Sequence, residues 1–226
     1  MSDQLWHLLQ TTDSTFPVGG FAHSYGLEGL VQNHWITNSE ELRSYIRNVW
    51  IPMFRHVDFP IVRLSREYAY DENALFRIDQ LAWATRATAE SRRAQSQMGQ
   101  QRLKMTAGLT GHHRLSELLN AMLNHRWMAN WPTVCGVESA CLNQKINDTL
   151  LAYGYQNING ILAASAKLIR IGPTEIQSIL HALRDPVAEA VDGSATISED
   201  EIGWFTPMLD ISGARHEHAY SRLFIS

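Results

Sequence analysis

Apolar residues recur along most of this chain at the three- and four-residue steps of an amphipathic α-helix. One stripe begins in residues 5–9, and a longer one runs from Leu42 to Val57. Asn38 or Ser39 can cap the longer helix, and Pro60 is expected to kink or interrupt its continuation. Because strand-like alternation is scarce, the sequence predicts an all-α fold, a bundle-like array of about eight to ten helices.

Helix start and stop signals in the sequence predict the bounds of several later helices. Asp71 is expected to open a helix, and the pattern over residues 146–171 is again helical until Gly172-Pro173 breaks it. Pro173 can then be the first residue of a new helix. The final segment, residues 203–226, has no clear period but contains apolar residues, which indicates docking onto this chain or onto a partner. We therefore expect one domain over residues 1–226, with a flexible C-terminal tail over residues 204–226.

The stretch from Thr88 to Met105 is the most unusual helix that the sequence predicts. Its composition favours a helix, but its apolar content is thin and Gly99 lies inside it. A helix this polar is expected to be exposed or to face another polar surface. Three interpretations stay open for its polar side chains: a partner interface, a solvated face, or an arginine finger for a GTPase. These side chains are Arg92, Arg93, Gln95, Gln97, Gln100, Arg102 and Lys104.

Composition excludes several classes of protein. Apolar residues make up 45% and charged residues 19% of 226 residues, which is typical of a globular domain. The net charge of −4 leaves no basic excess for nucleic acid, and no apolar run approaches the roughly 20 residues that span a bilayer. Residues 1–4 lack the start of a secretory signal, so we expect a cytoplasmic protein. The two cysteines, Cys135 and Cys141, are expected to be buried and reduced.

The segment from Phe16 to Glu28 predicts a shaped loop that leads into a helix, because Pro17 and the two following glycines restrict and then free the backbone. It lacks the residues of a phosphate-binding loop. Ser24 lies in an approximate nucleophile elbow, the turn that carries the catalytic serine of many hydrolases. That motif needs a preceding strand, and a turn stands there instead. We therefore favour a helix-capping role for Ser24 over a catalytic one.

Histidines raise the question of a nickel or zinc site. The candidates are His112 with His113, and His216 with Glu217 and His218. A protein site needs three or four convergent ligands, and neither group supplies them. The sequence therefore predicts surface or interface histidines and no cofactor, although direct nickel binding remains an open alternative.

Two terminal motifs resemble the UreF family of urease accessory proteins. Residues 16–28 are similar to the signature F-P-x-G-G-[FY]-x-H-S-x-G-L-E, and residues 210–226 are similar to D-I-A-S-x-R-H-E-x-x-Y-S-R-L-F-x-S. Between them, Glu90-Ser91-Arg92 with Met98-Gly99 resembles the polar helix of the family. Residues 131–136 resemble its entry to a central helix. The resemblance covers essentially the whole chain.

This resemblance implies an all-helical, dimerising, cytoplasmic protein without a settled catalytic activity of its own. It implies the partners UreD (also called UreH), the GTPase UreG and apo-urease, to which the complex delivers nickel. Activation or fidelity control of the UreG GTPase is the alternative role. We expect three partner-binding surfaces: Gly19, Gly20, His23, Tyr25 and Glu28; Arg92, Arg93, Gln97 and Gly99; and Arg215, His216, Glu217, Tyr220, Arg222 and Phe224.

Overall fold

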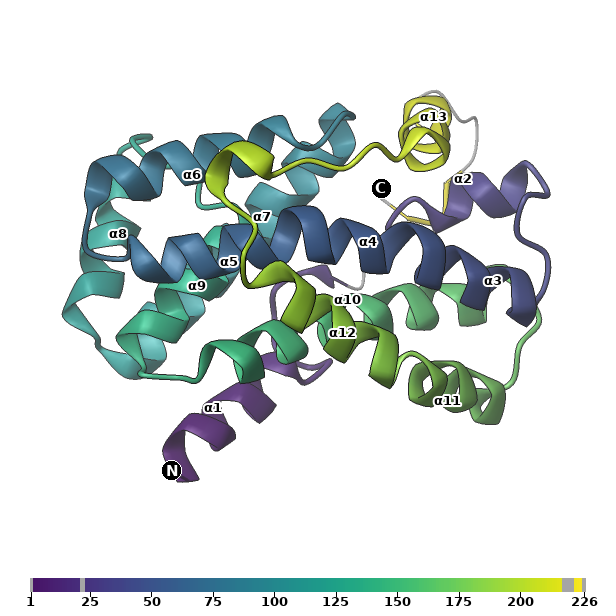
Figure 1. The fold of residues 1–226 in the computed structure, drawn as a ribbon, viewed down its shortest axis with the longest axis horizontal. Helices are drawn as coiled ribbons and strands as arrows, with labels where there is room; N and C mark the ends of the chain where they lie inside the picture. Colours follow the sequence, from purple (N-terminus) through teal and green to yellow (C-terminus); the bar gives the residue numbers. More distant parts are fainter. Residues whose placement is uncertain (1, 21–22, 217–221, 225–226) are drawn as a thin grey trace.

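The computed structural model describes residues 2–20, 23–216 and 222–224. Helices dominate these residues and none of them lies in a strand, so the all-α prediction is confirmed. None of the helices described is long and apolar enough to cross a membrane. Figure 1 shows one long helix through the centre, with the remaining helices on both sides of it and the N-terminal helix α1 (Ser2–Thr12) projecting from one edge.

The central helix is continuous over residues 39–67, but its backbone widens twice. It consists of α3 (Ser39–Tyr45), η2 (Ile46–Trp50), α4 (Ile51–Met53), η3 (Phe54–Asp58) and α5 (Phe59–Glu67). The two η segments are π-helical: the N–H of Ile51 donates to the carbonyl of Ile46, five residues back, and that of Phe59 donates to Phe54. Pro52 follows Ile51 and Pro60 follows Phe59. A proline has no N–H to donate and its ring crowds the preceding turn of a helix, and the wider π turn accommodates it. Pro60 therefore does not interrupt this helix.

Short-range capping fixes where several helices begin. The Asn38 side chain accepts from the N–H of Glu41, and the Asp71 side chain accepts from the N–H of Ala74. Both caps were expected, as was Pro173 at the start of α11. The helices that follow the central one are α6 (Glu72–Ala84), α7 (Ala89–Thr110), α8 (His113–Leu123), α9 (Trp131–Cys141), α10 (Ile146–Leu168), α11 (Pro173–Ala182) and α12 (Arg184–Ser194).

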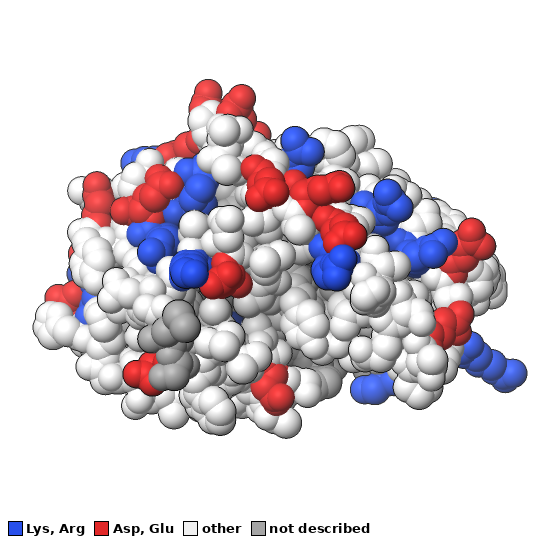
Figure 2. Space-filling model, turned by 60° about the horizontal axis from the view of Figure 1, so that its bottom comes forward, with Lys and Arg blue, Asp and Glu red and all other residues white. Residues whose placement is uncertain are grey.

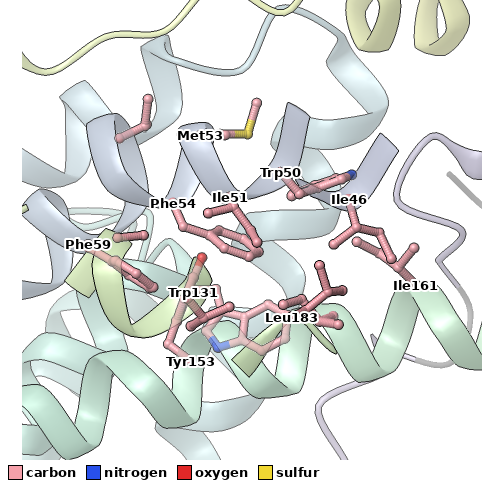
Figure 3. Close-up of a cluster of buried hydrophobic side chains, with 14 of the residues drawn as sticks. Ile46, Trp50, Ile51, Met53, Phe54, Phe59, Trp131, Tyr153, Ile161 and Leu183 are labelled. Atoms are coloured by element: carbon pink, nitrogen blue, oxygen red, sulfur yellow. The ribbon is translucent and has the colours of Figure 1, made fainter. Parts of the chain in front are cut away.

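The hydrophobic core forms two clusters on either side of α9. The larger one packs the central helix against α10–α12, with Phe54, Phe59, Trp131 and Tyr153 at its middle (Figure 3). The rings of Phe54 and Phe59 are stacked, with centroids 5.6 Å apart, and Tyr153 meets both edge-on. The smaller cluster joins α6, α8, α9 and the second half of α7. Nearly every residue of α9 is buried because it lies between the two clusters.

The polar helix α7 packs against α9 instead of facing only solvent. Arg102 and Glu138 are almost completely buried, and two hydrogen bonds of 2.8 and 2.9 Å join the guanidinium to the carboxylate. His7 Nε2 lies 2.9 Å from the same carboxylate, and Thr106 donates to it. The expectation that α7 is solvated or partner-facing was therefore wrong for Arg102 and for Gln95, which is also buried. On the buried face of α7, this ion pair and several polar side chains lie among a few apolar ones, Ala94, Met98, Leu103 and Ala107.

The C-terminal segment contains a helix that the absence of a period did not predict. After the short η4 (Glu199–Glu201), the chain crosses the molecule to α13 (Pro207–His216), which packs against α2 (Leu27–Gln32) (Figure 1). The helix is short, and only Ser212 and His216 on it are buried, so its apolar pattern is weak. A Cβ on Gly29 of α2 would lie 2.4 Å from the Ser212 hydroxyl, so this glycine permits the close approach.

Candidate functional site

The loop between α1 and α2 is anchored by two buried apolar side chains, Phe16 and Val18. Gly19 follows with a φ of +84°, a backbone conformation that glycine adopts at no steric cost. A Cβ on Gly20 would lie 3.3 Å from the Tyr25 hydroxyl, which is tighter than an ordinary contact. The expected shaped loop is therefore present. Gly19 is needed for its positive φ, and Gly20 is needed because Tyr25 packs closely against it.

Tyr25 fastens this loop to the rest of the protein. Its φ of +56° is unusual for a residue with a side chain. Its ring meets that of Trp50 edge-on, with centroids 5.9 Å apart, and a Cβ on Gly160 of α10 would lie 2.7 Å from the ring. Gly26 also has a positive φ, and a Cβ there would lie 2.4 Å from Leu209 of α13. Helices α10 and α13 thus both close on the loop.

Glu28, in the first turn of α2, is buried and binds the C-terminal segment. Its carboxylate accepts hydrogen bonds from the backbone N–H groups of Leu223 and Phe224, at 2.8 and 3.0 Å. His216 Nε2 lies 3.0 Å from the same carboxylate. The Ser24 hydroxyl accepts from the N–H of Glu28 at 3.3 Å, although the N-cap residue of α2 is Gly26 and not, as had been expected, Ser24. One buried carboxylate therefore connects α2, α13 and the tail.

Glu90, at the start of α7, completes the arrangement. Its carboxylate lies 3.0 Å from His216 Nδ1 and accepts a hydrogen bond of 2.6 Å from Arg222. Glu28 and Glu90 thus hold His216 between them, and both also bind the residues that follow it. We call these four side chains, Glu28, Glu90, His216 and Arg222, the C-terminal junction. It joins three segments that are far apart in the sequence.

Two cavities lie beside the C-terminal junction. One of about 100 Å³ is lined by His23, Glu90 and His216 together with aromatic and methionine side chains from the central helix, α7 and α9. The other, of about 390 Å³, lies between the loop and α10, and Phe224 lines it. His23 and Tyr25 border both. Burial lowers the pKa of His23, which favours the neutral imidazole there.

Neither cavity contains a complete set of reactive groups. Among the described residues, no group of three or more His, Cys, Asp and Glu side chains is placed to hold a metal ion. The described residues before Ser24 form no strand, so the context that a nucleophile elbow needs is missing. His218 of the candidate metal group lies outside the described residues. Glu28, Glu90 and His216 pack α2, α7 and α13 together beside these cavities.

Comparison with known proteins shows the family to which the chain is related. The sequence profile of the UreF family matches residues 36–184. Urease accessory protein UreF of Actinobacillus pleuropneumoniae serotype 5b is 31% identical over 225 residues, which cover 99% of both chains. UreF of Marinomonas sp. is 31% identical over 99% of this chain and 94% of its own, and UreF of Haemophilus influenzae strain PittGG is 30% identical over 97% and 94%.

The chain belongs to the UreF family. The resemblance seen in its terminal motifs is thereby confirmed. In this member of the UreF family, the motifs at the two ends of the chain meet in space at the C-terminal junction, although about 190 residues separate them.

The structure corrects how accessible the expected partner-binding residues are. His23, Glu28, Gly99, His216 and Phe224 were expected on partner-facing surfaces, but they are buried inside the chain. For Gly99 the reason is packing, because a Cβ there would lie 2.1 Å from the carbonyl oxygen of Ala129. For the other four, the reason is that the loop, α2 and the tail bind one another.

The remaining candidates lie at or near the surface. Gly19, Arg93, Gln97, Arg215 and Arg222 are exposed, and Gly20, Tyr25 and Arg92 are partly buried. Their roles in partner binding stay predictions. Glu217 and Tyr220 lie outside the described residues.

Arg92 already has partners within the chain. Its guanidinium donates to the carbonyls of Arg86 and Ala87, at 2.7 and 2.9 Å, and lies over the Trp83 ring. It therefore closes the turn between α6 and α7. Arg215 lies over the Trp35 ring and donates to Asn33, which fastens α13 beside the end of α2.

Sequence reasoning did not assign a role to Glu90. It was part of the motif that resembles the UreF family, but nothing local distinguishes it from any acidic residue in the first turn of a helix. Its partners His216 and Arg222 are more than 120 residues away. The only local signal was the thin apolar content of α7, which left its polar side chains without an explanation.

Proposed function

We propose that this protein is a scaffold for urease maturation. In this proposal it assembles with UreD and the GTPase UreG in the cytoplasm, acts as a homodimer, and supports nickel delivery to apo-urease without catalysing a reaction itself. Membership of the UreF family, with curated relatives that match 99% of the chain, is the observation that carries the proposal.

Two features of the surface support a protein-binding role. Large apolar side chains are exposed on and before α13, at Trp204, Phe205, Met208 and Ile211, and on α1, at Leu5, Trp6 and Leu9. On the face that Figure 2 shows, acidic and basic side chains are mixed in one band, and a broad area below it has few charged residues. Uncharged surface with exposed apolar side chains is typical of a protein interface.

The experiment that tests this proposal is reconstitution of urease activation. Apo-urease, UreD, UreG, nickel and GTP are combined with and without this chain. We expect active urease only when the chain is present, and co-purification of UreD and UreG with it. Equal activation in its absence, or a UreD–UreG complex that excludes it, would contradict the proposal.

The alternative role is activation of the UreG GTPase by an arginine finger. Such an arginine accelerates hydrolysis about 10³-fold or more. Both arginines donate to carbonyls of their own chain, Arg92 to Arg86 and Ala87 and Arg93 to Ala89, but Arg93 is the more exposed and therefore the better placed of the two. Single-turnover GTP hydrolysis by UreG with wild-type chain, Arg92→Ala and Arg93→Ala separates the roles. A scaffold predicts changes of only a few-fold.

A further inference from the structure

His216 lies between two carboxylates in the C-terminal junction. Its Nε2 is 3.0 Å from Glu28 and its Nδ1 is 3.0 Å from Glu90. An ionised carboxylate only accepts hydrogen bonds, and a neutral imidazole has a single N–H. A neutral His216 can therefore donate to only one of two ionised carboxylates. For both contacts to be hydrogen bonds, one extra proton must be present, either on the second ring nitrogen of His216 or on Glu28 or Glu90.

The surrounding charges favour placing this proton on His216. Ionisable side chains reach the cluster from the loop, α2, the turn before α7, α7, α13 and the tail. They are His23, Glu28, Arg86, Glu90, Asp210 and Arg222. Arg222 is the one cation that bonds to either carboxylate directly among the described residues, and it bonds to Glu90. A protonated His216 supplies the second positive charge, and its side chain is too deeply buried for water to replace it.

We propose that His216 is a proton-dependent latch, which docks the C-terminal segment on α2 and α7 when its ring is doubly protonated and releases that segment when one proton is lost. After that loss, one ring nitrogen presents a lone pair to a carboxylate 3.0 Å away. The carboxylate that faces the lone pair is then repelled, and both carboxylates also bind the tail: Glu28 accepts from Leu223 and Phe224, and Glu90 accepts from Arg222. The latch thus links one side chain to the position of the tail.

An imidazole generally changes its charge between about pH 5 and 8, and the latch is tested across that range. The segment is expected to be docked at the acidic end of this range and released at the alkaline end. Loss of one buried charge-assisted hydrogen bond is expected to weaken docking about tenfold or more. The inference concerns the isolated chain, so it stands or falls separately from the proposed role in urease maturation.

Amide hydrogen exchange of the full-length chain tests the latch. The readout is the protection factor of the Leu223 and Phe224 amides, each referred to its unprotected rate at the same pH. In wild type we expect this factor to fall about tenfold or more between about pH 6 and pH 8.5. Amides in the buried middle of α10, such as Ile161, serve as the internal reference and are expected to stay protected.

Two variants, with a third as a control, test whether His216 is the group whose protonation controls docking. In Glu90→Gln, the amide oxygen can accept from Arg222 while the amide N–H donates to a neutral His216, so no extra proton is needed. We expect this variant to stay docked at both pH values. In His216→Gln, docking is expected to be weak and independent of pH. His23→Gln, which changes the neighbouring histidine, is expected to keep the wild-type pH dependence.

The contradicting results are equally specific. Protection at Leu223 and Phe224 that is absent at both pH values, or the same at both, would overturn the latch. So would a pH dependence that persists in His216→Gln or disappears in His23→Gln, because another group would then control docking.

Discussion

Two buried clusters of charged side chains in this protein have similar chemistry and different positions. In the first, Glu138 of α9 binds Arg102 of α7 and His7 of α1, in the middle of the fold. In the second, Glu28 of α2 and Glu90 of α7 bind His216 and Arg222 at the end of the chain. The first joins long helices that also pack through apolar side chains. The second holds a terminal segment that packs mainly on α2 and, among its described residues, contributes only Phe224, with Leu209 packed against it, to the larger core cluster.

A buried carboxylate in a helical protein can therefore contribute to global stability or to the docking of one segment, depending on where it lies. Around Glu138, the ion pair cannot open unless α7 and α9 separate, so its energy is part of global stability. Around Glu28, the proposed latch predicts that the tail and the end of α13 leave while the other helices stay packed. The same kind of interaction thus fixes the fold in one place and controls a local transition in the other.

The largest expected effect comes from breaking the central cluster. Glu138→Ala leaves the Arg102 guanidinium buried without its carboxylate, and we expect a loss of about 3–5 kcal/mol in the free energy of unfolding. Urea denaturation measures it. The matched control is Glu199→Ala, which removes a more exposed ion pair with Arg77 and is expected to lower stability by less than about 1 kcal/mol. Equal effects of the two substitutions would remove the distinction between buried and exposed pairs.

The contribution of Glu138 to global stability should also depend on pH. Burial opposes ionisation of Glu138, but the Arg102 charge and hydrogen bonds from His7 and Arg102 outweigh it and lower the pKa to about 2. Because this folded value lies below the ordinary value of 4.5, the contribution is fully present above about pH 4.5 and is lost as the pH falls towards 2.

The contribution of Glu138 amounts to about 3 kcal/mol. Urea denaturation at about pH 7 and pH 3 measures the larger part of it, about 2 kcal/mol, because pH 3 still lies above the folded pKa of about 2, and Glu138→Gln should be clearly less acid-sensitive than wild type. If the two lose the same stability on acidification, the low pKa of Glu138 does not contribute.

Two glycines of α7 test how closely this helix packs. A Cβ on Gly99 meets backbone atoms of residues 129–131 at 2.1 to 2.7 Å, whereas a Cβ on Gly108 meets nothing within 4 Å. We expect Gly99→Ala to destabilise by about 1–3 kcal/mol or more through overpacking. Gly108→Ala is expected to stabilise by about 0.5–1 kcal/mol, because alanine favours a helix. Thermal unfolding of the pair checks both signs, and a tolerated Gly99→Ala would contradict the close approach.

The smallest effect on global stability is expected at the C-terminal junction. Glu28→Ala removes the acceptor of the Leu223 and Phe224 amides and of His216. Because this segment can leave without unfolding the helices, we expect the free energy of unfolding to change by about 1 kcal/mol or less while those two amides lose their protection. A loss as large as that of Glu138→Ala would mean that the tail is part of the core.

Local features of the fold could be predicted from the sequence, and distant contacts could not. Asn38, Asp71 and Pro173 mark helix starts through interactions within a few residues, so their roles could be inferred. The helical interpretation of residues 207–216 was missed, because a short helix with two buried residues has almost no apolar period.

The candidate site was predicted only in part. The three segments that form it were each singled out, but as separate surfaces, because no local pattern shows that Glu28 binds a histidine 188 residues away. The charged side chains of α7 were assigned to the outside for the same reason, since the partner of Arg102 lies 36 residues further along the chain.

The most direct test of the central claim is binding of UreD to a chain that ends at residue 214. Co-expressed UreD is purified with the full-length chain and with this truncation, and the thermal unfolding of each is recorded. The account predicts that the truncation keeps a cooperative unfolding transition and loses UreD. A truncated chain that retains UreD at the wild-type level would contradict the prediction that the C-terminal segment, with Arg215 and Arg222 at its surface, takes part in the proposed UreD scaffold.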